Sequence, residues 1–170
     1  MSTGVTIRRL GRPGDLGWVV MTHGELYAGE FGWTSDFEVL VAGIVADYAR
    51  IHDGRREAAW IAEVDGKRVG CVFCVAEDDT TAKLRLLLVN ADGRGHGLGG
   101  ALVDTCVNFA RDAGYSTLRL WTNDVLAAAR HLYLERGFIL IDQETHHSFG
   151  VELVGLTYEL DLRTSIRGGR

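Results

Sequence analysis

The chain has 170 residues, of which 46% are hydrophobic and 24% are charged, and its formal net charge is −5 at pH 7. This length and composition predict one globular domain over residues 1–162, with a core shared by a sheet and several helices, and a disordered tail over residues 163–170. The acidic balance argues against a nucleic-acid partner, because no basic stripe exists to neutralise phosphates, and it favours a cationic acceptor.

No apolar run approaches membrane-spanning length, and the first ten residues lack the hydrophobic segment of a signal peptide. We therefore expect a soluble protein of the cytoplasm with no membrane partner. The three cysteines agree with a reducing compartment. Cys71 and Cys74 have the spacing of a redox or zinc pair, but residues three apart in a strand point to opposite faces, so the sequence predicts buried thiols.

The predicted elements begin with a short strand at residues 5–10, and apolar residues at helical spacing then predict helices over residues 16–28 and 35–51. Residues 25–33, between the two helical patterns, are rich in aromatic side chains, carboxylates and glycine. They are interpreted either as a packed connection or as the wall of an acceptor pocket. In the second interpretation Glu30 and Trp33 contact the acceptor.

Two strands at residues 58–64 and 68–76 flank Asp65-Gly66, which is a strong hairpin signal because a type I′ turn needs positive φ at both positions. The next strand, residues 83–90, contains an unbroken apolar run at residues 86–89 that predicts burial on both faces. An amphipathic helix follows and ends at Gly114. A strand at residues 116–122 then implies a parallel, right-handed crossover.

The last elements are a helix over residues 124–136 and two strands, one at residues 138–141 that extends toward residue 145 and one at residues 152–162. The predicted fold class is therefore α/β (α+β), with about seven strands and about four helices.

The most informative stretch is a glycine-rich loop between the strand at 83–90 and the helix that follows it. The unpaired N–H groups at the start of a helix attract anions, and glycines let a phosphate approach the backbone closely, so the loop predicts a phosphorylated ligand. Residues 95–100 also match the dinucleotide pattern G-x-G-x-x-G, with Asp124 as the ribose-binding acid. This interpretation is disfavoured because residues 90–94 separate the strand from the first glycine and only about two helices' worth of chain remains.

The motif Arg94-x-x-Gly97-x-Gly99 closely resembles the signature of the GNAT superfamily of N-acetyltransferases, and the resemblance covers nearly the whole chain. A second family motif is matched by Ala129-x-x-Leu-Tyr133 followed by Gly-Phe138. The resemblance implies a mixed, mostly antiparallel twisted sheet. More narrowly, residues 121–138 and 146–150 resemble the acetyltransferase half of MarR-type regulator fusions, but the chain lacks a winged-helix half, so DNA binding is not carried over.

The resemblance implies acetyl-CoA as co-substrate and a role for each matching residue. Leu87, Leu88 and Val89 would pair through their backbone with the pantetheine arm, and Arg94 would orient the loop or reach a phosphate. The N–H groups that would cradle the pyrophosphate belong to Gly95, His96, Gly97, Leu98, Gly99 and Gly100. Tyr133 would protonate the departing thiolate as a general acid.

Two positions depart from the family pattern. Many members place a cofactor-binding asparagine where this chain has Leu126, and Asn123 is the nearest available amide. The central strand also lacks the glutamate that some members use as a general base. The base is left open between a water chain, Glu30, and one of His146 and His147, which point to opposite faces of a strand. Without a third ligand the histidine pair predicts no metal.

The sequence thus predicts an acetyl-CoA-dependent N-acetyltransferase that transfers an acetyl group directly to an amine. The alternative is a catalytically silent acyl-CoA-binding sensor or interaction module. The acceptor itself is not specified, and the residues expected to contact it are Glu30, Trp33, His146 and His147. Aromatic residues near the last strands make a homodimer plausible.

Overall fold

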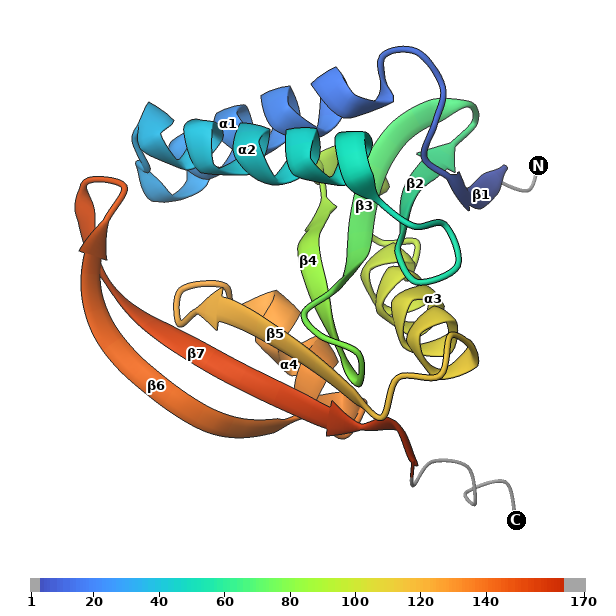
Figure 1. The fold of residues 1–170 in the computed structure, drawn as a ribbon. Helices are drawn as coiled ribbons and strands as arrows, with labels where there is room; N and C mark the ends of the chain where they lie inside the picture. The colour runs from blue at the N-terminus through green and yellow to red at the C-terminus, as the bar shows by residue number, and fades with distance from the viewer. Residues whose placement is uncertain (1–3, 164–170) are drawn as a thin grey trace.

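A computed structural model describes residues 4–163, and the protein folds around one seven-stranded sheet with the strand order β1-β2-β3-β4-β5-β7-β6 (Figure 1). The strands are β1 (Val5–Arg9), β2 (Ala58–Val64), β3 (Lys67–Ala76), β4 (Thr81–Val89), β5 (Thr117–Asn123), β6 (Ile139–Ser148) and β7 (Val151–Asp161). The helices are α1 (Asp15–Phe31), α2 (Ser35–Ile51), α3 (Leu98–Asp112) and α4 (Ala127–Glu135), with a 3₁₀ turn, η1 (Ala91–Gly93). All pairs of neighbouring strands are antiparallel except β4 and β5. The predicted fold class is confirmed. Apart from Arg163, the predicted disordered tail lies outside the described residues.

Helices cover both faces of the sheet, so the protein has two hydrophobic cores. One core joins α1 and α2 to the sheet, and the other joins α3 and α4 to the opposite face (Figure 1). Cys71 lies in the first core and Cys74 in the second, as the strand geometry predicts. Burial raises the pKa of the Cys71 thiol, so it is a structural rather than a reactive group.

Two helix boundaries differ from the predictions. The first helix continues to Phe31 and ends at Gly32, whose φ of 71° lets its N–H bond back to the carbonyls of Tyr27 and Ala28. Most of the predicted connection at residues 25–33 is therefore helical. The fourth helix begins at Ala127, three residues late, because Asp124 is bonded to Val154 of β7 through both its backbone and its side chain.

The parallel pair β4 and β5 governs the shape of the molecule. The two strands pair only over Thr81–Lys83 and Thr117–Arg119, and beyond these residues they separate. On its other side β4 carries a bulge against β3, where Leu86 has a φ of 57° and its carbonyl accepts a hydrogen bond from the Cys71 thiol at 3.1 Å. The predicted two-sided burial of residues 86–89 holds only for Leu88, because the neighbouring side chains border the opening between the strands.

A buried carboxylate ties the start of α1 to the sheet. Asp15 is fully buried and receives charged hydrogen bonds from Arg8 of β1 at 2.9 Å and Arg68 of β3 at 2.8 Å, and the backbone N–H groups of Gly11 and Arg12 donate to the same carboxylate. The Arg8 guanidinium and these N–H groups hold the pKa of Asp15 well below its usual range. The pairs anchor the helix pair that covers the opening.

We predict that Asp15→Asn lowers the free energy of unfolding by about 3 kcal/mol at pH 7, because two partly buried arginines lose their anion. Since the pKa of Asp15 is lowered in the folded protein, its stabilisation is present above about pH 4 and is lost as the pH falls below that value. The difference from wild type in urea unfolding should therefore shrink on acidification. Asp47→Asn, which removes an exposed pair with Arg50, is the control and should cost less than about 0.5 kcal/mol. A cost that small for Asp15→Asn would contradict the prediction.

Candidate active site

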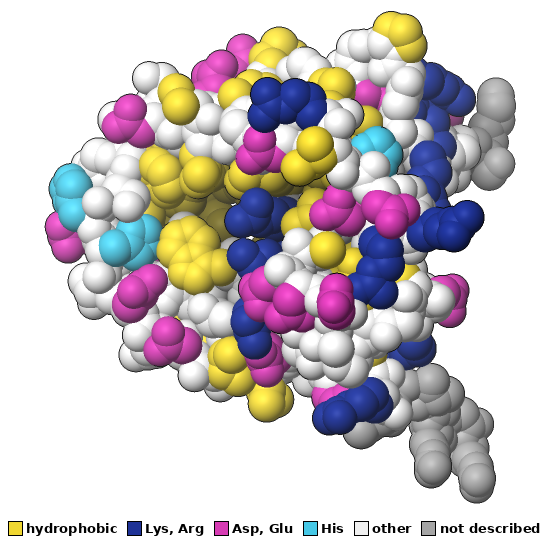
Figure 2. Space-filling model, in the orientation of Figure 1, with side chains coloured by type: hydrophobic (Ala, Val, Ile, Leu, Met, Phe, Trp, Pro, Cys, Tyr) yellow, Lys and Arg dark blue, Asp and Glu magenta, His cyan; other side chains and the backbone are white. Residues whose placement is uncertain are grey.

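The opening between β4 and β5 leads into two cavities that meet inside the protein. One, of about 770 Å³, runs from the glycine loop along the end of β4, and the other, of about 530 Å³, lies under α1 and α2. Four residues line both cavities: Tyr27, Leu87, Leu126 and Ala129. Figure 2 shows the mouth of the smaller cavity as a hollow with hydrophobic walls and several basic side chains. We call the two spaces the loop cleft and the inner cavity.

The loop cleft is built around backbone donors. The six consecutive N–H groups of residues 95–100 have no hydrogen-bond acceptor among the described residues, and the last three begin the 15-residue helix α3. Gly97 precedes the helix with a φ of 69°, and a Cβ added there would meet open space. Asn90 holds the turn before it by accepting from the N–H of Gly93 at 3.1 Å. This concave row of donors at a positive helix end is suited to a phosphate.

Gly99 and Gly100, at the end of the loop, allow close packing between two helices. A Cβ at Gly99 would lie 2.9 Å from Leu132, and Gly100 lies against the guanidinium of Arg136, which is paired with Asp104 at 2.7 Å. These glycines therefore let α4 approach α3, and their side-chain positions face α4 rather than a ligand. Only their N–H groups remain available to the cleft.

Arg94 and His96, the two charged or titratable side chains of the loop, lie in different places. Arg94 reaches α1 and forms an ion pair with Glu30 at 2.5 Å, and both residues line the loop cleft. His96 is exposed and its Nδ1 lies near the carbonyls of Gly93 and Arg94, at 3.2 and 3.1 Å. Glu30, predicted as an acceptor contact, thus lies beside the glycine-rich loop and does not line the inner cavity.

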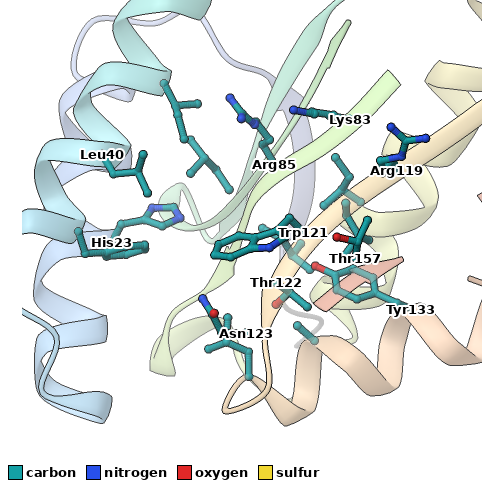
Figure 3. A pocket seen from close by; sticks show the side chains of 18 of the residues that line it. His23, Leu40, Lys83, Arg85, Arg119, Trp121, Thr122, Asn123, Tyr133 and Thr157 are labelled. Carbon is teal, nitrogen blue, oxygen red and sulfur yellow. The ribbon is translucent and has the colours of Figure 1, made fainter. Parts of the chain in front are cut away.

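The inner cavity combines aromatic and basic walls. Trp33 is 4% exposed, stacks on Tyr27 at 5.2 Å and on Phe149 at 5.0 Å, and also lines the cavity. Trp33 is thus packed among aromatic rings and also exposes part of its side chain to the cavity, and its contact with an acceptor stays a prediction. From the other side Trp121 projects into the cavity, and Lys83, Arg85 and Arg119 gather at one end of it (Figure 3).

Tyr133 of α4 lines the inner cavity and is 4% exposed (Figure 3). Ala129, one helical turn earlier on α4, lines both cavities. The Tyr133 hydroxyl has no hydrogen-bond partner among residues 4–163, and burial raises its pKa, so the phenol stays protonated at neutral pH. A buried hydroxyl without a protein partner is uncommon, and this one is free to donate a hydrogen bond to a group that enters the cavity. Tyr27 is a second phenol of this kind, with its pKa also raised by burial.

The predicted amide and histidines form a separate group on β5 and β6. Asn123 accepts a hydrogen bond from Nε2 of His146 at 2.9 Å, and Nδ1 of the same ring accepts from Ser148 at 2.9 Å. Asn123 lines the inner cavity and does not line the loop cleft. His147 is exposed on the opposite face and pairs with Glu152 at 2.7 Å. Leu126 occupies the position where the resembled family pattern has a cofactor-binding asparagine, and it lines both cavities.

Sequence reasoning missed His23, which is 2% exposed and lines the inner cavity. Its Nδ1 lies 2.8 Å from the carbonyl of Val19, so Nδ1 carries the hydrogen and Nε2 is a free acceptor. Burial lowers the pKa of His23 to about 4. The sequence signal for a functional role of His23 is weak, because a single histidine in an apolar helix is typical of a core residue.

The fold is a mixed sheet opened between β4 and β5, with two joined cavities and a row of backbone N–H donors at the start of α3. Residues 24–138 match the family model described as the acetyltransferase (GNAT) family, and the chain belongs to this family. Human N-acetyltransferase 8B and N-acetylaspartate synthetase of Xenopus tropicalis are 39% and 34% identical to it over 93 and 102 residues. These alignments cover 52% and 59% of this chain but 41% and 36% of the relatives, so the chain spans less than half of their length.

Solved structures share the fold. A ribosomal-protein-S18-alanine N-acetyltransferase from Escherichia coli gives a TM-score of 0.70 at 23% identity and covers 97% of this chain and 98% of that one. A GNAT family acetyltransferase from Elizabethkingia anophelis with acetyl-CoA bound gives 0.65 at 15% identity and covers 92% and 97%. Within residues 4–163 no helix is long and apolar enough to span a membrane, and no three His, Cys, Asp or Glu side chains are grouped to hold a metal.

We predict that His23 titrates with a pKa near 4 in the folded protein, measured from its imidazole carbon protons by NMR. The unfolded chain takes up this proton near pH 6.5, so acidification from pH 6.5 to 4 should cost up to about 3 kcal/mol of stability. His23→Gln should remove that part of the pH dependence. A pKa of 6 or above would show that the ring is solvated.

Proposed function

We propose that the chain is an acetyl-CoA-dependent N-acetyltransferase that transfers the acetyl group directly to an amine. The observation that carries this proposal is the unpartnered, buried hydroxyl of Tyr133 on the wall of the inner cavity, which shares four lining residues with the loop cleft. Family membership and the named N-acetyltransferases among the relatives support it. The two cavities provide separate spaces for a cofactor and an acceptor, joined at one reactive position.

The loop cleft fits a coenzyme A thioester from end to end. The row of free N–H groups at Gly95–Gly100 suits the pyrophosphate, and Arg94 stands beside it. Beyond Lys83, the edge of β4 facing β5 has no strand partner, so the backbone of Leu87, Leu88 and Val89 is available to an extended pantetheine arm as to an added strand. Leu126 offers an apolar contact at the position of the family's cofactor-binding asparagine. The side-chain oxygen of Asn123 accepts a hydrogen bond from His146.

The chain's own residues then supply positioning and one proton. When bound, acetyl-CoA supplies a reactive thioester carbonyl and a thiolate leaving group. The buried phenol of Tyr133 holds a proton at neutral pH and is placed to give it to the sulfur as the new N–C bond forms and the C–S bond breaks. Cys106 is a buried thiol inside α3 with a raised pKa, so no acyl-enzyme step is assigned to it.

Solvent is the proposed acceptor of the amine proton. Glu30, His146 and His147 do not line the inner cavity, and Glu77, the only carboxylate among residues 4–163 that lines it, is paired with Lys83 and Arg119. His23 does line the cavity, but a group with a pKa near 4 holds a proton too weakly to act as an effective base near pH 7. A silent acyl-CoA sensor would share the cleft, but it has no need of a buried phenol on the wall of the inner cavity.

Four further expectations belong to this proposal. A homodimer is supported by apolar side chains exposed beside the edge strand β6: Leu134, Ile139, Leu140 and Ile141. A cytoplasmic location is supported by the three buried cysteines, all of which are unbonded. The narrower resemblance to the acetyltransferase half of MarR-type fusions stays a prediction, as does the division into one domain over residues 1–162.

We predict that Gly97→Glu abolishes acetyl-CoA binding in a calorimetric titration, because it places a carboxylate in the phosphate cradle. Gly114→Glu is a matched control at the other end of α3, since it also has a left-handed φ, 94°, and open space for a Cβ. Both substitutions should cost about 1–2 kcal/mol of stability from backbone strain, and only the first should lose binding. Equal binding by both variants would contradict the assignment of the cradle.

We predict that Tyr133→Phe lowers kcat by about 10²- to 10⁴-fold with little change in acetyl-CoA affinity, because it removes only the donated proton. Tyr27→Phe removes a second unpartnered phenol, which lines both cavities, and should lose far less. Both are compared by CoA release at saturating substrates from pH 6 to 10. Full turnover by Tyr133→Phe over this range would remove the assignment, and a larger loss in Tyr27→Phe would transfer the role to that residue.

A further inference from the structure

Three basic side chains form one end of the inner cavity. Lys83 and Arg85 alternate along β4 and therefore point to the same face, and Lys83 is directly opposite Arg119 on β5. All three line the cavity, at the end where the two strands are still paired, and Figure 3 shows them together on one side of it. This arrangement concentrates positive charge inside a protein whose net charge is −5.

Two of these cations are already neutralised by the fold. Lys83 pairs with Glu77 at 3.5 Å, and Arg119 pairs with Glu77 and with Glu159 of β7. Two carboxylates thus serve these two cations and leave the third without a counter-ion.

Arg85 is that third cation. None of the described carboxylates lies within 4.0 Å of its guanidinium, although it is only partly exposed. Asp78 and Asp79 line the hollow on its other side and also stay beyond that distance. Because a guanidinium offers a fork of N–H donors that matches a carboxylate, Arg85, which has no carboxylate partner among the described residues, is suited to bind a carboxylate that enters the cavity.

The rest of the cavity is apolar and leads toward Tyr133. The indole of Trp121 lies against Gly155 of β7, where an added Cβ would be 2.7 Å from the ring, so only glycine lets the indole lie this close to the strand. Tyr27 and Trp33 form the facing wall. Leu87, which reaches both cavities, is two residues beyond Arg85, roughly 7 Å along the strand.

We propose that the acceptor is a small molecule that carries both an amine and a carboxylate, as an amino acid does, and that Arg85 binds the carboxylate and so directs the amine toward Tyr133. This inference rests on the proposed function and names its substrate class. The carboxylate is the group that a fork of guanidinium donors matches bidentately, and the aromatic walls suit an apolar side chain. Arg85 is then the residue that selects amino acids over simple amines.

The test compares amino acids with the amines that remain when their carboxylate is removed. The pairs are L-phenylalanine with 2-phenylethylamine, L-tyrosine with tyramine, L-tryptophan with tryptamine and L-leucine with 3-methylbutylamine. CoA release is measured with acetyl-CoA saturating. We expect wild-type kcat/KM to favour the amino acid by about tenfold or more in at least one pair, chiefly through KM.

In that pair, Arg85→Gln should bring the ratio close to one, and Arg85→Lys should retain part of the preference. Arg55→Gln makes the same chemical change at an exposed loop residue whose side chain has no partner in the described chain, and it should behave as wild type. Calorimetric titration with acetyl-CoA should give the same affinity for wild type and Arg85→Gln, which shows that the variant is folded.

The outcomes separate the two proposals. If wild type acetylates amines but prefers the decarboxylated member of every pair, or if Arg85→Gln leaves the ratio unchanged, the carboxylate assignment is wrong and the transferase proposal stands. If wild type binds acetyl-CoA but acetylates none of these compounds, the carboxylate inference also fails, and a broader amine screen then decides the transferase proposal. Absence of acetyl-CoA binding by the folded protein would overturn both.

Discussion

The structure depends on the short length of the ladder between β4 and β5. Had these strands paired along their full length, the sheet would be continuous and the backbone of Leu87 to Val89 would be consumed by hydrogen bonds to β5. Three residue pairs hold them together, and the divergence that follows creates both cavities and leaves one strand edge unpaired inside the molecule. Unpaired backbone groups need a hydrogen-bond partner, so the exposed edge of β4 is suited to an extended polar ligand.

Much of this arrangement follows from local signals in the sequence. Asp65-Gly66 predicts its hairpin, whose turn residues have φ values of 51° and 81°, and the glycine loop predicts a helix start that binds anions. The late start of α4 escapes prediction because its cause is a contact between Asp124 and Val154, thirty residues away. The bulge at Leu86 escapes for the same reason, since it exists only relative to the register of β3.

The sequence predicts the residues of the candidate site whose role depends on their own backbone conformation. It does not predict the residues whose role depends on contacts with distant parts of the chain. Gly97 could be placed from its motif, but the contact of Gly100 with Arg136 required the position of α4. Lys83 and Arg85 alternate with apolar residues and read as solvent-facing positions of a strand. That one is neutralised and the other is not depends on Glu77 and Glu159, which only tertiary structure brings to the cavity. The net charge of the whole chain likewise does not predict the charge of a cavity wall. Distant charges are screened, so a group in the cavity responds mainly to charges within a few ångströms.

The narrow seam between β4 and β5 also affects the mechanics of the protein. It divides the sheet into a four-stranded and a three-stranded part, each with its own continuous hydrogen-bond network. The two parts are joined by three residue pairs, by the packing of α3 against α4, by the Arg119–Glu77 ion pair and by the stacking of Trp33 on Phe149. A ligand lying along the seam would touch both parts, so its binding free energy would add to the cohesion between them. Ligand binding at the site would then also raise the free energy of local opening along this line of the sheet.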